Sequence, residues 1–312
     1  MNLENYHLYS YDKNKVSYLK ALLPFVIIVH HLSHYGIAHI EFAKTWDKMA
    51  IAFFFAMSGY GLIVSYRNKS DYLHGFIEKS FTKLYIPYLY ALVLFVIYYI
   101  CFDVSIVDII TNDICALVPA SWFIFVLSLF YLFFYVVFKY CNFSIVYKAF
   151  GVGLLVFFYY YIANYCDISP WRFLRTPAFC VGMFFGLFDD QICKKMKIHH
   201  CILGIIICVL GNRISGMQPI FSSILLFLII YIVPSLPNCS FVNRLSSISL
   251  ELYIFQYIPI YLIVEQSLIT SPIVVILSVI ICDIILASIM HTAIKRTVSK
   301  INNLNRHQYA EK

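Results

Sequence analysis

Charged side chains are scarce in this sequence, where Asp, Glu, Lys and Arg together make up 12% of the 312 residues. A water-soluble domain of ordinary composition has about twice that share. The few charges lie between apolar runs of roughly 17–25 residues, the length that spans the hydrocarbon core of a bilayer. Because 62% of the residues are hydrophobic, we predict an all-α, polytopic integral membrane protein.

Several other features are missing. Neither end carries a long hydrophilic stretch, so we expect no separate soluble domain, and the first apolar run lacks a small-residue cleavage site, so we expect a retained helix. The ten cysteines form no C-x-x-C or Cys/His pattern with metal-ligand spacing, and we expect no metal. Glycine and proline are sparse and no internal repeat is visible, which disfavours a secondary transporter built from paired halves.

The distribution of basic residues predicts the topology. If the N-terminus is cytoplasmic, eighteen of the 23 Lys and Arg residues lie in inner segments, as the positive-inside rule requires. We therefore expect both termini inside and about ten transmembrane helices, and we read the net charge of +7 as a topology signal and not as a nucleic-acid site. The predicted spans are 21–40, 49–66, 84–102, 118–138, 145–163, 174–189, 200–212, 218–234, 248–267 and 271–292.

The first span carries the clearest candidates for chemistry. Lys20 and His31 are eleven residues apart, about three helical turns, and so share one face. The rise of roughly 16 Å places Lys20 at the cytoplasmic rim and His31 near the middle of the bilayer, with His30 and His34 beside it. An ionisable residue at that depth is a functional candidate. The alternative is a neutral histidine that only bonds a neighbouring helix.

The sequence resembles the membrane-bound acyltransferase family 3, which O-acylates bacterial surface glycans and other acceptors. The spacing of Lys20 and His31 is similar to the Arg-x10-His signature in the family's first helix. The likeness extends in order over about residues 16–296. The other segments that carry it are Phe53–Tyr60 (FFFAMSGY), Phe76–Tyr88 (FIEKSFTKLYIPY), Ser121–Phe123 (SWF), Phe184–Gly186 (FFG) and Ile248–Gln256 (ISLELYIFQ).

The resemblance implies a division of the chain and a substrate pair. Residues 1–15 would be a cytoplasmic segment, 16–296 an acyltransferase family 3-like transmembrane domain and 297–312 a cytoplasmic tail. The donor would be acyl-coenzyme A, acetyl-CoA above all, and the acceptor a glycan or glycolipid hydroxyl outside a bacterial cytoplasmic membrane. Oligomeric state is not indicated.

The donor's phosphates need cations at the inner surface. The residues expected to supply them are Lys20, Arg67, Lys79 and Lys83. Lys20 and Lys83 stand where arginine is common in the family, and lysine lacks the planar fork that grips phosphate through two hydrogen bonds. Ordinary topology signal is the competing explanation for the basic residues between the second and third spans.

His31 is the expected general base on the acceptor hydroxyl, since an imidazole has an unperturbed pKa near 6.5 and needs no metal. His30 or His34 would orient it or contact the acceptor. Asp283 lies midway along the last span and, as an intramembrane carboxyl, calls for a partner such as an imidazole of the first span. A protonated or Ser/Tyr-bonded carboxyl is the alternative.

The remaining candidates concern the substrates. Ser58 offers a covalent acyl-enzyme, although a membrane-helix serine more often bonds the carbonyl one turn back. Glu41 and Trp122 belong to a polar, aromatic outer rim that suits sugars, although tryptophan is also enriched at membrane interfaces. Tyr253 and Gln256 lie in the late motif of the family, where Gln256 replaces a histidine common in relatives.

The leading hypothesis is therefore a membrane O-acyltransferase with His31 as general base. The alternatives are a transporter or flippase of a lipid-linked sugar, with the histidines as a proton relay, and a structural subunit without chemistry. Proton-coupled transport predicts carboxylates at depth in several helices, whereas Asp283 is essentially the only one here.

Overall fold

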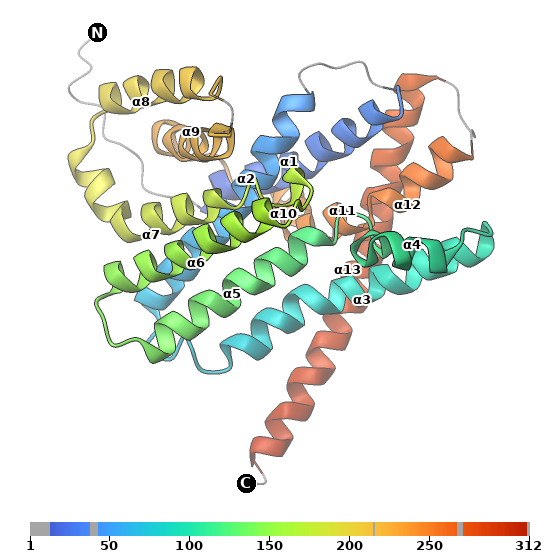
Figure 1. Ribbon diagram of the computed structural model, residues 1–312, viewed down its shortest axis with the longest axis horizontal. Coiled ribbons are helices and arrows are strands. Elements are labelled where there is room, and N and C mark those ends of the chain that lie inside the picture. Colours follow the sequence, from blue (N-terminus) through green and yellow to red (C-terminus); the bar gives the residue numbers. More distant parts are fainter. Residues whose placement is uncertain (1–12, 38–42, 215, 267–270, 311–312) are drawn as a thin grey trace. The chain divides into compact units, whose positions relative to one another are not determined.

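The structure is a computed structural model that describes residues 13–37, 43–214, 216–266 and 271–310. Within these ranges the chain is helical and contains no strand (Figure 1). The prediction of an all-α protein is confirmed.

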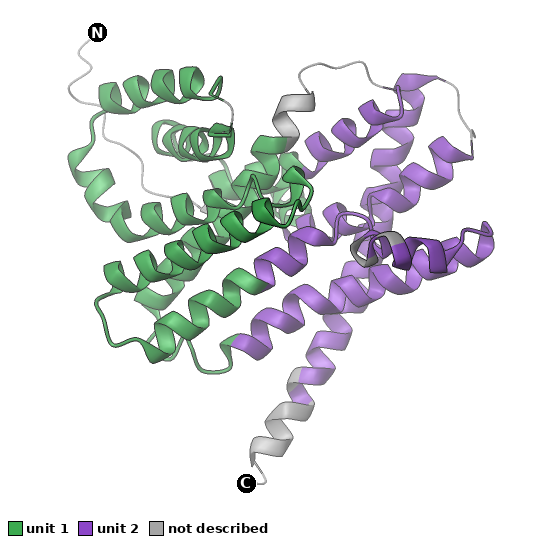
Figure 2. Cartoon of the chain, in the orientation of Figure 1, with its two compact units in different colours: residues 1–23, 41–76, 129–246 green, residues 24–40, 77–128, 247–312 purple. Residues whose placement is uncertain are grey.

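The chain forms two compact units, coloured separately in Figure 2. Unit 1 comprises residues 1–23, 41–76 and 129–246, and unit 2 comprises residues 24–40, 77–128 and 247–312. Two helices are divided between the units by more than a terminal residue, α1 (Lys13–His34) and α5 (Trp122–Tyr140). Pro24 lies inside α1 at the residue where unit 2 begins.

Unit 1 is built around the contact between α2 (Ala43–Asn68) and α7 (Pro177–Lys195), in which glycines let the two backbones approach closely. A Cβ atom at Gly182 of α7 would lie 1.7 Å from the carbonyl oxygen of Ala56, and one at Gly59 of α2 would lie 2.2 Å from that of Phe179. Small residues at such positions are the usual means by which membrane helices pack tightly. The remaining helices of unit 1 are α6 (Ile145–Tyr165), α8 (Ile198–Gly211), α9 (Gln218–Ile232) and most of α10 (Ser240–Ser247).

Unit 2 is centred on the last helices of the chain. Its helices are α3 (Phe76–Cys101, from Ile77 onward), α4 (Ile106–Asn112), α11 (Ser249–Phe255), α12 (Tyr257–Ile260) and α13 (Pro272–Ala310), and a short π-helix occupies Tyr261–Glu265. The end of α1 packs here, because Ile28 and Leu32 share an apolar cluster with Ile260, Ile263, Val275 and Val279. This cluster fixes the position of the residues that follow Ile28 on α1.

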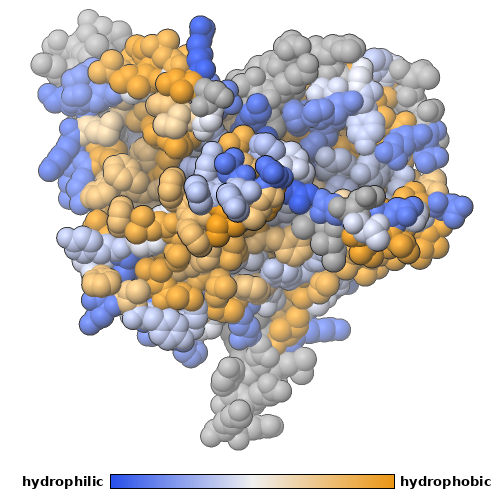
Figure 3. Space-filling model, viewed as in Figure 1, coloured by the Kyte–Doolittle hydropathy of each residue, from blue (hydrophilic) through white to orange (hydrophobic). Residues whose placement is uncertain are grey.

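In the part of the chain that the structure describes, six helices are long and apolar enough to cross a membrane, or seven if the bent pair α10 and Ser249–Glu265 counts as one span. The helix α13 exposes Leu277, Ile281, Ile285 and Ile289, which follow one another at four-residue spacing and so form one stripe. Broad hydrophobic areas also cover the face shown in Figure 3. An apolar surface of this extent suits lipid and not water, and the chain is a multi-pass membrane protein.

Each of the ten predicted spans corresponds to a helix or to the bent pair, but their number as crossings stays a prediction. Helices α8 and α9 have 14 and 15 residues, about 21–23 Å at 1.5 Å per residue, and a bilayer core is about 30 Å thick. The first span was predicted to reach residue 40, whereas α1 ends at His34, and Gly36 there has a positive φ of 74°. The predicted spans also leave out α4.

Candidate active site

The three histidines of the first span lie together at the end of α1, in unit 2. His30 and His31 are half-buried, and His34 is exposed. The Nε2 atoms of His30 and His34 are 3.1 Å apart, a hydrogen bond across one helical turn, and the ring centroids of His30 and His31 are 5.4 Å apart. The structure thus brings the three imidazoles into one continuous group, as the sequence indicates.

Tyr257 holds the ring of His31. Its hydroxyl lies 2.9 Å from His31 Nδ1, and the two ring centroids are 4.7 Å apart. Tyr257 is the first residue of α12, and it comes directly after the Ile248–Gln256 segment. Reasoning from the sequence missed it, because one tyrosine among 26 carries no signal by composition; its place next to that segment was the available clue.

The contact of His31 with Tyr257 determines what the imidazole can do. A neutral imidazole has one N–H donor and one nitrogen with a free lone pair. If Nδ1–H donates to the Tyr257 oxygen, the lone pair is on Nε2, and Nε2 is then the basic atom. The hydrogen bond made by one ring nitrogen of a functional histidine determines which tautomer the other nitrogen presents.

The carboxyl of Asp283 does not meet an imidazole. Asp283 is fully buried on α13, and neither of its oxygens has a hydrogen-bond partner among the described residues. The orienting role expected for Asp283 stays a prediction with no contact to support it. The structure instead pairs a different carboxylate with a histidine: Glu251 Oε1 lies 2.6 Å from His291 Nδ1, and Glu251 is buried. That pair joins α11 to α13 and was not expected from the sequence.

Three expected substrate-binding residues of unit 2 form part of its buried framework. Trp122, Tyr253 and Gln256 are all buried. The Tyr253 hydroxyl donates to the carbonyl oxygen of Ala120 at 3.2 Å, and the Gln256 side-chain amide donates to the carbonyl oxygen of Tyr253 at 2.8 Å. The Tyr253 bond ties α11 to the residues just before α5, and the Gln256 bond closes the end of α11 on itself.

The four expected donor-binding cations are divided between the units, with Lys20 and Arg67 in unit 1 and Lys79 and Lys83 in unit 2. Lys79 and Lys83 are both exposed and lie four residues apart in the first two turns of α3. At that spacing they share one face of the helix. Lys20 is half-buried on α1.

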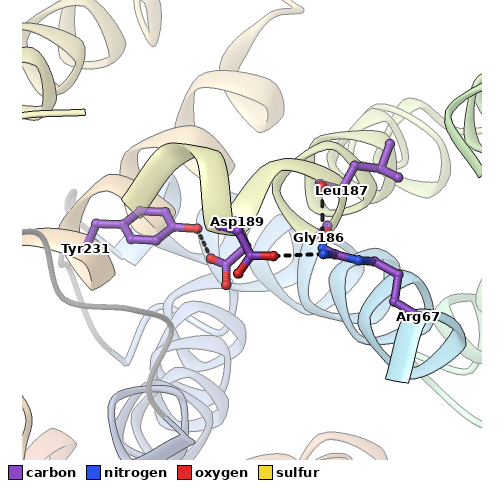
Figure 4. Close-up of polar contacts among 6 residues, drawn as sticks. Arg67, Gly186, Leu187, Asp189 and Tyr231 are labelled. Atoms are coloured by element: carbon purple, nitrogen blue, oxygen red, sulfur yellow. Dashed lines mark hydrogen bonds and ion pairs between the residues drawn. The ribbon is translucent and has the colours of Figure 1, made fainter. Parts of the chain in front are cut away.

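Arg67 is engaged with α7, as Figure 4 shows. Its guanidinium donates to Asp190 Oδ2 at 2.8 Å and to the carbonyl oxygen of Gly186 at 3.0 Å. Beside this contact, the hydroxyl of Tyr231 on α9 donates to Asp189. The Arg67 guanidinium therefore joins α2 to the later half of α7. A donor phosphate at Arg67 would have to share the guanidinium with Gly186 and Asp190 or displace them.

Ser58 and Glu41 complete the expected set. The Ser58 hydroxyl donates to the carbonyl oxygen of Phe54 at 2.9 Å, one turn back on α2, which is the common arrangement of a serine in a membrane helix. Glu41 lies outside the described residues. Over the described part of the chain, no group of three His, Cys, Asp or Glu residues is placed to hold a metal ion.

Comparison with known proteins gives one match. The family model of the acyltransferase 3 family, described as an acyltransferase domain, matches residues 13–291. Neither curated proteins nor solved structures give a match. The matched region includes the three histidines of α1, Tyr257 and the Glu251–His291 pair.

Proposed function

Because the chain belongs to the acyltransferase 3 family and is an acyltransferase, we propose that it moves an acyl group from cytoplasmic acyl-coenzyme A to a hydroxyl of a cell-surface glycan or glycolipid. Acetyl is the group we propose. Membership of the family favours this activity over the transporter and the structural subunit considered from the sequence.

The observation that carries the mechanism is the contact of His31 Nδ1 with the Tyr257 hydroxyl. With Nδ1–H donated to Tyr257, His31 Nε2 takes the proton of the acceptor hydroxyl. The hydroxyl oxygen attacks the thioester carbonyl, the carbon–sulfur bond breaks, and the proton passes from Nε2 to the departing coenzyme A thiolate. The reaction leaves an ester and free coenzyme A.

Lys79 and Lys83 are proposed as the main cations for the donor phosphates, because they are exposed on one helix face and lie in the first two turns of α3. The N-terminal end of a helix favours anions through its dipole. Lys20 and Arg67 belong to unit 1 and stay predicted phosphate-binding residues, and Arg67 could bind phosphate only if its bonds to Gly186 and Asp190 are shared. Lysines bind phosphate as point charges, which suits a donor that must be released after each transfer.

The membrane arrangement that goes with this function has ten crossings, both termini in the cytoplasm and a location in a bacterial cytoplasmic membrane. The excess of Lys and Arg in the predicted inner segments supports it. In that arrangement Lys20 lies near the cytoplasmic surface and His31 lies deep in the membrane, so the acyl group has to travel along α1.

The test uses membranes that contain the protein, acetyl-CoA labelled in the acetyl group, and surface glycan as acceptor. His31→Ala should lower transfer by at least about a hundredfold, the lower range for loss of a general base. His199→Ala, which changes an exposed histidine of α8, serves as the matched control and should transfer as the native protein does. Undiminished transfer by His31→Ala at equal expression would refute the mechanism.

A further inference from the structure

A carboxylate lies between two tyrosine hydroxyls in unit 2, where three elements meet. Glu265 is the last residue of the π-helix, Tyr35 directly follows α1, and Tyr98 lies in the last turn of α3. The Tyr35 hydroxyl donates to Glu265 Oε1 and the Tyr98 hydroxyl to Glu265 Oε2, both at 3.3 Å. These distances exceed the usual 2.5–3.0 Å of an O–H···O bond, so a ligand can exchange for them at little cost.

The cluster is open to a ligand at two of its three residues, and the third, Tyr98, is buried. Glu265 and Tyr35 are exposed, and Tyr35 exposes 38% of its surface. Burial, followed by the charge of Glu265, raises the pKa of Tyr35 to about 12, so the phenol keeps its proton and stays a donor at any physiological pH. Short π-helices occur rarely and are frequent at functional sites.

A run of aromatic rings connects this cluster with His31. The ring centroids are 5.5 Å apart for Tyr98 and Tyr261, 5.6 Å for Tyr261 and Tyr257, and 4.7 Å for Tyr257 and His31. Each step is within the range of direct ring contact. The residue that orients the proposed base and the residue that bonds Glu265 are therefore linked through one intervening side chain, Tyr261.

The chemistry of the cluster selects its ligand. The two oxygens of an ionised carboxylate can accept hydrogen bonds from two neighbouring hydroxyls of a sugar. Tyrosine hydroxyls both donate and accept hydrogen bonds. Aromatic rings offer apolar faces for the C–H surfaces of a sugar ring. An acidic sugar would meet like charge at Glu265, which costs binding energy.

We propose that Tyr35, Tyr98 and Glu265 bind a neutral sugar unit of the acceptor, and that the tyrosine run guides the reacting hydroxyl towards His31. The proposal rests on the proposed function, because it identifies where that function's acceptor binds. It assigns specificity for neutral over acidic sugars to Glu265.

The test is direct binding to the full chain in lipid nanodiscs. The probe is de-O-acylated surface glycan of the producing cell, cut into oligosaccharides and separated into neutral and acidic fractions, and binding is measured by equilibrium dialysis. We expect the neutral fraction to bind the native protein, and Glu265→Gln to weaken this binding by about tenfold or more, the effect of losing a hydrogen bond to a charged group. Tyr35→Phe, a change at an exposed position, should weaken binding by a smaller factor.

Two controls and an independent readout complete the design. Asp108→Asn on α4 and Tyr165→Phe on α6 alter an exposed carboxylate and an exposed tyrosine elsewhere, and both should bind glycan as the native protein does. Acetyl-CoA binding should be the same in every variant, which shows that each has folded. The proposal would be overturned if Glu265→Gln and the native protein bound glycan equally, or if neither bound it. A preference of the native protein for the acidic fraction would also overturn it.

The outcomes separate this proposal from the proposed function. His31→Ala should bind the neutral fraction normally while transferring no label. If His31→Ala still transfers label while Glu265→Gln fails to bind glycan, the mechanism at His31 is wrong and the acceptor site stands. If His31→Ala loses transfer but Glu265→Gln binds glycan and transfers label normally, the mechanism at His31 stands and the acceptor site at Glu265 is wrong.

Discussion

At the scale of single residues, the bond between His31 and Tyr257 gives the two ring nitrogens different roles. One nitrogen orients the ring, and the other is the proposed base. The phenol touches Nδ1 and leaves Nε2 as the other nitrogen of the ring. A hydroxyl in this place performs the task that a carboxylate performs in other histidine-based sites, where the partner of Nδ1 sets the tautomer and the ring angle. A phenol does this without adding a buried negative charge, which would be costly in a membrane.

Tyr257→Phe tests this role, because it removes one oxygen and keeps the ring. We expect kcat to fall by about 10- to 100-fold, as for a hydrogen bond worth roughly 1.4–2.8 kcal/mol. The donor KM should stay within about twofold, since the phenol does not touch the proposed phosphate cations. Steady-state kinetics with labelled acetyl-CoA would measure both constants, with Tyr165→Phe as control. A rise in the donor KM at constant kcat would contradict an orienting role.

Reasoning from the sequence found the histidines and missed what holds them. The Lys20–His31 spacing is a property of one helix, and the helical period makes it readable. The Tyr257 contact joins residues 226 positions apart, and no local pattern encodes such a pair. For Asp283 the depth rule predicted a partner, but the structure gives it none among the described residues and places Glu251 against His291.

At the scale of helices, the tight packing of α2 against α7 depends on two glycines. Two glycines bring the backbones so close that no Cβ atom fits at Gly182 or Gly59. The same α2 also carries Arg67, whose bonds to Gly186 and Asp190 join it to the later half of α7. Any change that separates the two helices should therefore also disturb Arg67.

Gly182→Ala should destabilise the protein by about 1–3 kcal/mol, the cost of overpacking a tight contact. Gly61→Ala is the matched control, because Gly61 lies on α2 with no atom within 4 Å of its Cβ position, and alanine there should be neutral or stabilising by about 0.5–1 kcal/mol. Thermal unfolding of both variants in the same detergent would compare them. Equal melting temperatures would show that α2 and α7 can move apart freely.

The helices themselves were largely predicted from the sequence, and the interruption near the C-terminal end was not. Runs of apolar residues marked every predicted span because burial in lipid requires them. The break between α11 and α12 and the π-helix after it fall inside the single predicted span 248–267. Pro259 lies in α12, and a proline cannot donate the hydrogen bond to the carbonyl four residues back, which here belongs to Phe255, the last residue of α11. The sequence therefore carried a signal for the break that the span prediction did not use.

At the scale of the whole molecule, the proposed function requires donor and acceptor to come from opposite sides of the membrane. The basic residues predict which side each loop occupies, but α7, α8 and α9 fall outside the helices that qualify as spans by length and apolarity. If α7 did not cross, every later loop would change sides, and Lys194, Lys195 and Lys197 would lie outside. The orientation of α7 therefore decides the topology of the second half of the chain.

Single-cysteine versions of the protein test this orientation with a membrane-impermeant maleimide on intact cells. Cys166 is exposed after α6 and Cys193 is half-buried in the last turns of α7, so a crossing α7 puts them on opposite sides. We expect Cys166 to react in intact cells, and Cys193 and Cys141 only in opened ones. Ile214→Cys, at an exposed position after α8, should react in intact cells if α7 and α8 both cross. Reaction of Cys166 and Cys193 from the same side would show that α7 does not cross. The protein would then have fewer than the ten predicted crossings.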